Sequence, residues 1–170
     1  MPGYLLDTQT ITYWFNGASG SFPNVDATAR RLPPDSPLYV SAITLGEIQY
    51  GHALDPTGEG TKRTEFLKFV REELPQVLNV SHHTGEPYGR VRARLVEKVP
   101  PPGGWGKRRR AEQMYDPVAG RELGIDENDL WIVAQAIERN LILVTNDKMK
   151  RIREAVADLY PASQIDNWAG

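Results

Sequence analysis

The sequence predicts an α/β fold, because apolar runs of strand length alternate along the chain with segments of helical period. In the helical segments apolar residues recur at every third or fourth position, as at Tyr88, Val91 and Leu95. Parallel strands need a crossover connection, which is usually a helix, so we expect a parallel sheet covered by helices on both faces. The runs of strand length are residues 4–7, 38–41, 76–80 and 141–144.

The clearest single unit spans residues 126–144. Leu130, Val133 and Ile137 form an apolar stripe on the expected helix, and Asn140 can take the left-handed position that ends it. The apolar run 141–144 follows directly. This segment therefore predicts a helix connected at once to a buried strand.

Length and composition predict a single domain, 1–170. The chain is 40% hydrophobic and 25% charged, and no apolar run approaches the roughly 20 residues that cross a bilayer. It opens without a basic region or an apolar run of secretory length, so we expect a cytoplasmic protein. Because the chain has no cysteine, a metal would be held by oxygen or imidazole. The net charge of −2 means that nucleic-acid binding would rely on local patches.

Residues 100–120 interrupt the alternation of strands and helices. The stretch opens with three prolines followed by two glycines, and both residue types oppose helix and sheet interiors. We interpret it as an inserted excursion within the one domain.

Three acidic residues follow predicted strands. Asp7 ends the first strand, Glu47 lies just past the second, and Asp147 follows the run 141–144. Ligands of open parallel sheets bind at the carboxyl ends of the strands, so we expect these three acids at one edge. Asp129 lies in the first turn of a predicted helix and precedes a strand, so strand order alone does not place it there.

Each acid also has a purely structural interpretation. Thr44 and Glu47 have the spacing of a helix capping box. Asp7, Asp129 and Asp147 stand where a helix can begin, and acids are favoured at such positions. For each acid taken singly, a cap is the simpler explanation.

Gathered at one place, the same acids require protons or a cation. Two like charges about 4 Å apart repel by roughly 4 kcal/mol at an effective dielectric near 20. Oxygen donors without sulfur favour magnesium or manganese over zinc. Such an ion activates water and stabilises charge on a phosphoryl oxygen, which favours phosphodiester hydrolysis. Phosphatases and phospho-acceptor domains also gather acids at this edge, so residue types alone leave them open.

Four stretches of the chain carry a more specific pattern. They are Tyr4-Leu5-Leu6-Asp7-Thr8, Ser41-Ala42-Ile43-Thr44-Leu45-Gly46-Glu47-Ile48, Asn128-Asp129-Leu130-Trp131-Ile132-Val133-Ala134-Gln135-Ala136 and Leu143-Val144-Thr145-Asn146-Asp147. Together they resemble the motifs of PIN-domain ribonucleases, and among these the VapC-type toxins of toxin–antitoxin pairs. The resemblance covers most of the chain except the insert.

The resemblance implies a PIN-like three-layer α/β fold with a five-stranded parallel sheet flanked by helices. It further implies an endoribonuclease that depends on Mg²⁺ or Mn²⁺, forms a homodimer and is inhibited by a cognate antitoxin protein. Thr8 and Thr145 would support the metal site. Gln9 departs from the asparagine of many family members. The catalytic and metal-binding residues that the resemblance implies are Asp7, Glu47, Asp129 and Asp147.

Candidate RNA contacts lie in the insert, where a tryptophan and four cations could stack on bases and contact phosphates. The alternative is a solvated surface, which charge runs commonly form. The residues are Trp105, Lys107, Arg108, Arg109 and Arg110, with Arg90, Arg92 and Arg94 as more distant candidates.

A catalytically inactive PIN-like module that binds RNA or protein is the main alternative function, and the retention of all four acids argues against it. A haloacid-dehalogenase-type phosphatase would need a second aspartate two residues after Asp7, where Gln9 stands.

Overall fold

The computed structural model describes residues 2–17, 24–54, 60–98 and 124–169. The insert predicted at about 100–120 lies outside these ranges. The candidate RNA-binding residues Trp105, Lys107, Arg108, Arg109 and Arg110 lie outside them too.

Within the described residues, five parallel strands form one sheet in the order β3-β2-β1-β4-β5. The central strand β1 is in register with both neighbours, so that Leu5 lies opposite Tyr39 on β2 and Leu143 on β4. The strands are β1 Tyr4–Leu6, β2 Leu38–Ser41, β3 Gln76–Leu78, β4 Ile142–Val144 and β5 Ile165–Asp166.

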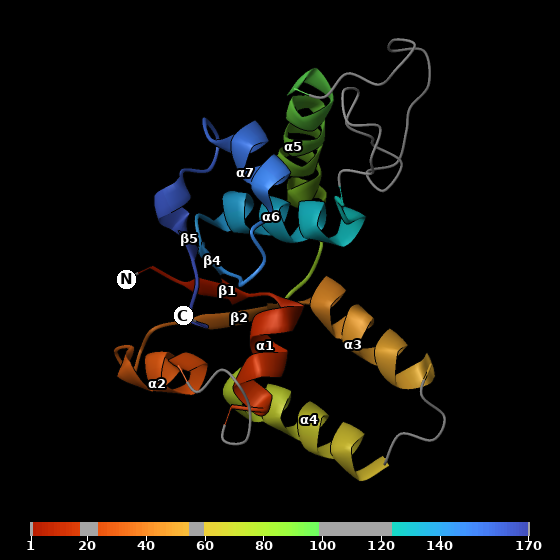
Figure 1. Ribbon diagram of the computed structural model, residues 1–170, viewed down its shortest axis with the longest axis vertical. Coiled ribbons are helices and arrows are strands. Elements are labelled where there is room, and N and C mark those ends of the chain that lie inside the picture. The colour runs from red at the N-terminus through yellow and green to blue at the C-terminus, as the bar shows by residue number, and fades with distance from the viewer. Residues whose placement is uncertain (1, 18–23, 55–59, 99–123, 170) are drawn as a thin grey trace.

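Helices cover both faces of this sheet (Figure 1). One layer consists of α1 Thr8–Phe15, α2 Asn24–Arg31, α3 Ala42–Leu54 and α4 Gly60–Glu73. The other consists of α5 Gly85–Lys98, α6 Glu127–Arg139 and α7 Lys150–Val156. Two short 3-10 helices, η1 His82–Thr84 and η3 Ala162–Gln164, precede α5 and β5.

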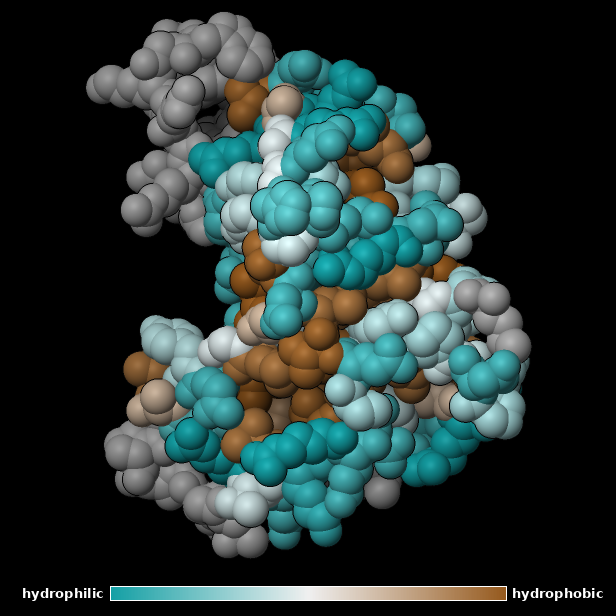
Figure 2. All heavy atoms as spheres, turned by 180° about the vertical axis from the view of Figure 1, so that it is seen from behind, coloured by the Kyte–Doolittle hydropathy of each residue, from teal (hydrophilic) through white to brown (hydrophobic). Residues whose placement is uncertain are grey.

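Successive residues of the central strands point into two separate cores, because side chains alternate across a strand. Leu5 and Leu143 pack in the core under α5, α6 and α7. Leu6 and Val144 pack in the core under α1 to α4. On the rear face, hydrophobic residues are visible across the waist between the two more polar helical layers (Figure 2). The expected three-layer α/β fold with a five-stranded parallel sheet is therefore confirmed.

The predicted elements differ from the observed ones mainly at their ends. Asp7 and Leu141 lie just outside β1 and β4, and β3 stops at Leu78. The helix predicted from residue 126 begins with Asp126 as N-cap, whose carboxylate accepts the Asn128 N–H. It ends at Asn140 in the left-handed conformation, as its sequence predicted.

Every helix within the described ranges falls short of the length and apolar character that a membrane span requires.

Candidate metal centre

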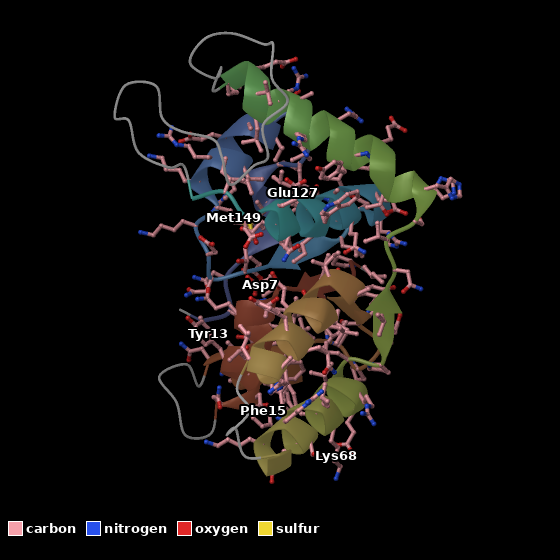
Figure 3. All side chains as sticks on the ribbon, turned by 90° about the vertical axis from the view of Figure 1, so that its right-hand side faces the viewer. Asp7, Tyr13, Phe15, Lys68, Glu127 and Met149 are labelled. Atoms are coloured by element: carbon pink, nitrogen blue, oxygen red, sulfur yellow. The ribbon has the colours of Figure 1, made fainter. Side chains whose placement is uncertain are left out.

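All four predicted acids line one cavity of about 580 Å³ at the carboxyl edge of the sheet. Three adjacent strands, β2, β1 and β4, supply Glu47, Asp7 and Asp147 from the segments that follow them. In Figure 3, Asp7 lies between the two helical layers, with Tyr13 and Met149 on either side of it. The rest of the lining includes Thr8, Gln9, Thr12, Tyr13 and Ile132.

Asp129 reaches this cavity from the first turn of α6. Strand order alone did not place this residue at the site. Helix α6 packs against α3, and the Asn128 amide donates to Glu47 Oε1 at 2.8 Å. Because α6 ends just before β4 begins, its first turn lies at the opposite, carboxyl edge of the sheet, and the contact with α3 holds it beside Glu47.

Glu47 is held by two donors, one on each carboxylate oxygen. Asn128 Nδ2 donates to Oε1, and the hydroxyl of Thr8 donates to Oε2. The donors come from α6 and α1, so Glu47 links three helices at the site. A capping box of Thr44 with Glu47 is excluded, because α3 already begins at Ala42.

Asp7 is 6% exposed and caps α1 by accepting the Thr10 N–H at 2.7 Å. Burial raises the pKa of its carboxyl, and the negative charge of Asp147 adds to the rise. Hydrogen bonds from Thr10 and Thr145 lower the pKa again and offset part of this effect. Asp7 therefore caps a helix and also lines the acidic cavity.

Thr145 connects Asp7 with Asp147. Its hydroxyl oxygen accepts the Asp147 N–H at 3.0 Å, and the side chain also forms a hydrogen bond to Asp7. Asp147 in turn accepts the Met149 N–H at 3.1 Å. Thr145 thus contacts the segments of two acids, and Thr8 contacts Glu47.

The pKa of Asp129 is strongly raised. Burial and, to a smaller extent, the charges of neighbouring acids together raise its pKa from the ordinary 3.8 to about 7. The contributing neighbours are Asp126, Asp147, Glu47 and Asp7. The three other acids of the cavity therefore lie within electrostatic reach of Asp129, and a cation among them would relieve the repulsion.

The donor set fits a hydrated divalent ion better than an ion enclosed by all four acids. With the side chains as they lie, no group of three or more acidic or histidine side chains among the described residues is positioned to hold one ion. Each carboxylate can accept about four hydrogen bonds or metal contacts, so the bonds to Thr8, Thr10 and Asn128 leave acceptor sites open. Magnesium commonly retains several waters and binds through one or two carboxylates.

Comparison with known proteins identifies the family. The sequence pattern of the PIN domain matches residues 4–155. The chain belongs to the PIN domain family. Across 97% of its length this PIN domain protein is 26% identical to ribonuclease VapC2 of Rickettsia felis, which is covered to the same 97%.

Solved structures share the PIN fold over nearly the whole chain. VapBC2 of Rickettsia felis bound to a promoter DNA fragment matches with a TM-score of 0.67 at 24% identity, covering 97% of this chain and 98% of that one. VapBC-1 of nontypeable Haemophilus influenzae matches with a TM-score of 0.65 at 22% identity, covering 98% of both chains. The expected resemblance to VapC-type proteins is confirmed.

The arginines that sequence reasoning considered for RNA lie on α5 and do not line the acidic cavity of this PIN domain. Arg92 pairs with Glu127 at 3.2 Å, and Arg94 pairs with Glu97 and Asp158 at 3.0 and 2.8 Å. These contacts favour the solvated-surface interpretation.

Asn128 is the site residue that sequence reasoning missed. It directly precedes Asp129 in the most specific motif, but nothing in the motif shows that its amide reaches across to α3.

Proposed function

We propose that this PIN domain protein is a metal-dependent endoribonuclease, with Mg²⁺ or Mn²⁺ as cofactor, which hydrolyses RNA phosphodiester bonds. The observation that carries the proposal is the placement of Asp7, Glu47, Asp129 and Asp147 around one cavity, from four separate segments of the chain. The name of the relative ribonuclease VapC2 supports the same activity.

Residues of the chain would bind the ion at this site and hold the acidic side chains in a fixed orientation. Asp7, Glu47, Asp129 and Asp147 are the proposed ligands, directly or through bound waters. Thr8 and Asn128 hold the carboxylate of Glu47 in one orientation, and Thr145 does the same for the segment that carries Asp147. When bound, a divalent ion supplies a nucleophilic water and stabilises charge on the phosphoryl oxygen.

We further propose that the protein is the toxin of a toxin–antitoxin pair, that it acts in the cytoplasm, that it is a homodimer and that a cognate antitoxin inhibits it. The structures named VapBC support the pairing. The surface offers apolar side chains for protein contacts, among them Tyr50, Leu54, Val77 and Val80. A cavity of about 300 Å³ between α3, α4 and β3 adjoins Val77.

The decisive experiment is RNA cleavage by the purified protein with MgCl₂ or MnCl₂, and with EDTA as the blank. We expect the wild type to cut RNA and Asp7→Asn and Asp129→Asn to cut none while remaining folded. Asparagine caps a helix about as well as aspartate, so Asp7→Asn tests the chemistry without removing the cap of α1. Sequencing of the RNA ends made on induced expression would then identify the substrate.

A wild type that binds RNA or a partner protein but cuts no RNA with either ion would establish the inactive binding module instead. A gene for a small DNA-binding protein directly upstream would support the toxin assignment.

A further inference from the structure

A second cavity adjoins the acidic one and has the opposite charge along one wall. Its volume is about 300 Å³, and it shares Asp129 and Asp147 with the acidic cavity. The segment directly after Asp147 supplies the other wall, with Lys148, Lys150 and Arg151. Two adjoining cavities thus share two acids, and the second one adds three cations.

The acidic cavity needs such a neighbour to accept RNA. Its described lining contains no lysine or arginine, and its four acids repel a polyanion. A protein with a net charge of −2 gains no general attraction for RNA, so local cations have to supply the phosphate contacts.

The turn between β4 and α7, together with the first residues of α7, carries these cations. Met149 is buried, whereas Lys148 and Lys150 on either side of it are exposed. Met149 adopts the left-handed conformation, with φ 38° and ψ 35°. Such a conformation is costly for a residue other than glycine and is found preferentially at functional sites. The Met149 N–H is tied to Asp147 Oδ1, so the same turn orients an acid of one cavity and the cations of the other.

The ion pairs that two of these cations form with Glu154 are long. Lys150 and Arg151 both pair with the single carboxylate of Glu154, at 3.9 and 3.8 Å. Long, solvent-exposed pairs of this kind contribute roughly 0 to 1 kcal/mol, so a phosphate can replace Glu154 at little cost.

We infer that Lys148, Lys150 and Arg151 form a subsite that binds the phosphates of the RNA strand next to the bond being cut. The inference rests on the proposed ribonuclease activity, because it gives the strand a path from the basic cavity into the acidic one. Phosphate contacts carry no sequence information directly, so this subsite would contribute affinity and register and leave sequence preference to other surfaces.

The test measures binding of a short fluorescein-labelled single-stranded RNA of mixed sequence by anisotropy over a series of KCl concentrations. All variants carry Asp7→Asn, which should prevent cleavage; Asp7 lines the acidic cavity and is absent from the described lining of the basic one. The triple variant Lys148→Gln, Lys150→Gln, Arg151→Gln should bind at least about tenfold more weakly at low salt. Its slope of log affinity against log salt should be shallower by about 2, from about 0.7 for each lost phosphate contact.

Lys68→Gln is the matched control. Lys68 is an exposed lysine with the same kind of pair four residues on, at 3.8 Å to Glu72, and Figure 3 shows it at the far end of the molecule from Met149. It should leave affinity and slope unchanged, and replacement of Lys148 and Lys150 by arginine should preserve both. Lys150→Gln alone should lower the slope by about 0.7, which keeps the test valid if the triple variant fails to fold.

A triple variant with the slope of the Lys68→Gln control overturns the inference. In the native Asp7 background, the triple variant should raise KM and keep kcat, because the lost contacts bind substrate and transition state equally. A wild type that binds RNA with the full slope but cuts none contradicts the ribonuclease proposal alone. Cleavage with an unchanged slope contradicts the subsite alone.

Discussion

The acids of the cavity differ in the hydrogen bonds that hold their carboxylates. Glu47 is fixed on both oxygens, Asp7 is fixed as a helix cap, and Asp129 is left with the largest resolved rise in pKa of the group. A ligand set that is already oriented loses less entropy when an ion or a substrate binds. The consequences of removing one donor or one charge can therefore be stated residue by residue.

Asn128→Ala should lower cleavage by roughly 10- to 100-fold, the equivalent of the 1.5 to 3 kcal/mol of a hydrogen bond to a charged group. The substitution frees Oε1 of Glu47 and lets the carboxylate leave its orientation. Single-turnover cleavage and calorimetric Mn²⁺ affinity would both report the change. Gln49→Ala is the control, because it removes an amide of α3, the helix that carries Glu47, whose contact is with Arg63 instead. Equal effects of the two substitutions would contradict a positioning role for Asn128.

Asp129→Asn should stabilise the metal-free protein at high pH and have little effect at low pH. The folded-state pKa of about 7 lies above the ordinary 3.8, so the folded protein binds more protons than the unfolded chain between these values. Stability from this group is therefore lost as pH rises through that window, and asparagine removes the loss. Urea unfolding in EDTA near pH 5 and near pH 8 measures the difference. Asp35→Asn, which removes an exposed carboxylate outside the cavity, is the control.

At the scale of elements, local signals explain which parts of the fold were predictable. The strands β1, β2 and β4 are apolar because both faces are buried, and α6 carries an apolar stripe with a cap at each end. Strand β5 has only two residues and is defined by its pairing with β4, so no local pattern marks it.

The candidate site was predictable to the same degree. Strand order placed Asp7, Glu47 and Asp147, whereas Asp129 needed the family motif, because its position depends on the packing of α6 against α3. Asn128 and the basic wall after Asp147 were missed, since both depend on contacts across helices and turns.

The C-cap of α6 offers a direct test of local backbone strain. Asn140 has φ 51° and ψ 48°, a region that costs a residue with a branched side chain roughly 1 to 2 kcal/mol. Asn140→Val should lower the free energy of unfolding by about that amount, whereas Asn140→Gly should change it by less than about 0.5 kcal/mol. Chemical denaturation of both variants measures the contrast. Equal destabilisation would point to the exposed bond from Gln164 to Asn140 as the main contribution.

At the scale of the whole molecule, the candidate site lies where the two cores meet. Asp7 and Glu47 belong to segments of the α1 to α4 layer, and Asp129 comes from α6 on the other face. An ion bound among them would therefore join both layers across the sheet.

Mn²⁺ should consequently raise the thermal unfolding midpoint of the wild type. An ion at 100 times its Kd stabilises the folded state by about 2.7 kcal/mol if it does not bind the unfolded chain. Calorimetric scans with MnCl₂, against NaCl of matched ionic strength, would measure the shift. Asp129→Asn should lose most of it, and an equal shift in Lys68→Gln and the wild type would show that the comparison is sound. A full shift in Asp129→Asn would remove that residue from the ion's surroundings.

The double duty of Asp7 has an evolutionary consequence. Aspartate and asparagine differ by a single base change in their codons, and either residue can begin α1. One such mutation would abolish the proposed nuclease activity while the scaffold persists. Descendants of such an event would still occupy a partner without cutting RNA, so inactive decoys are readily reached from this architecture.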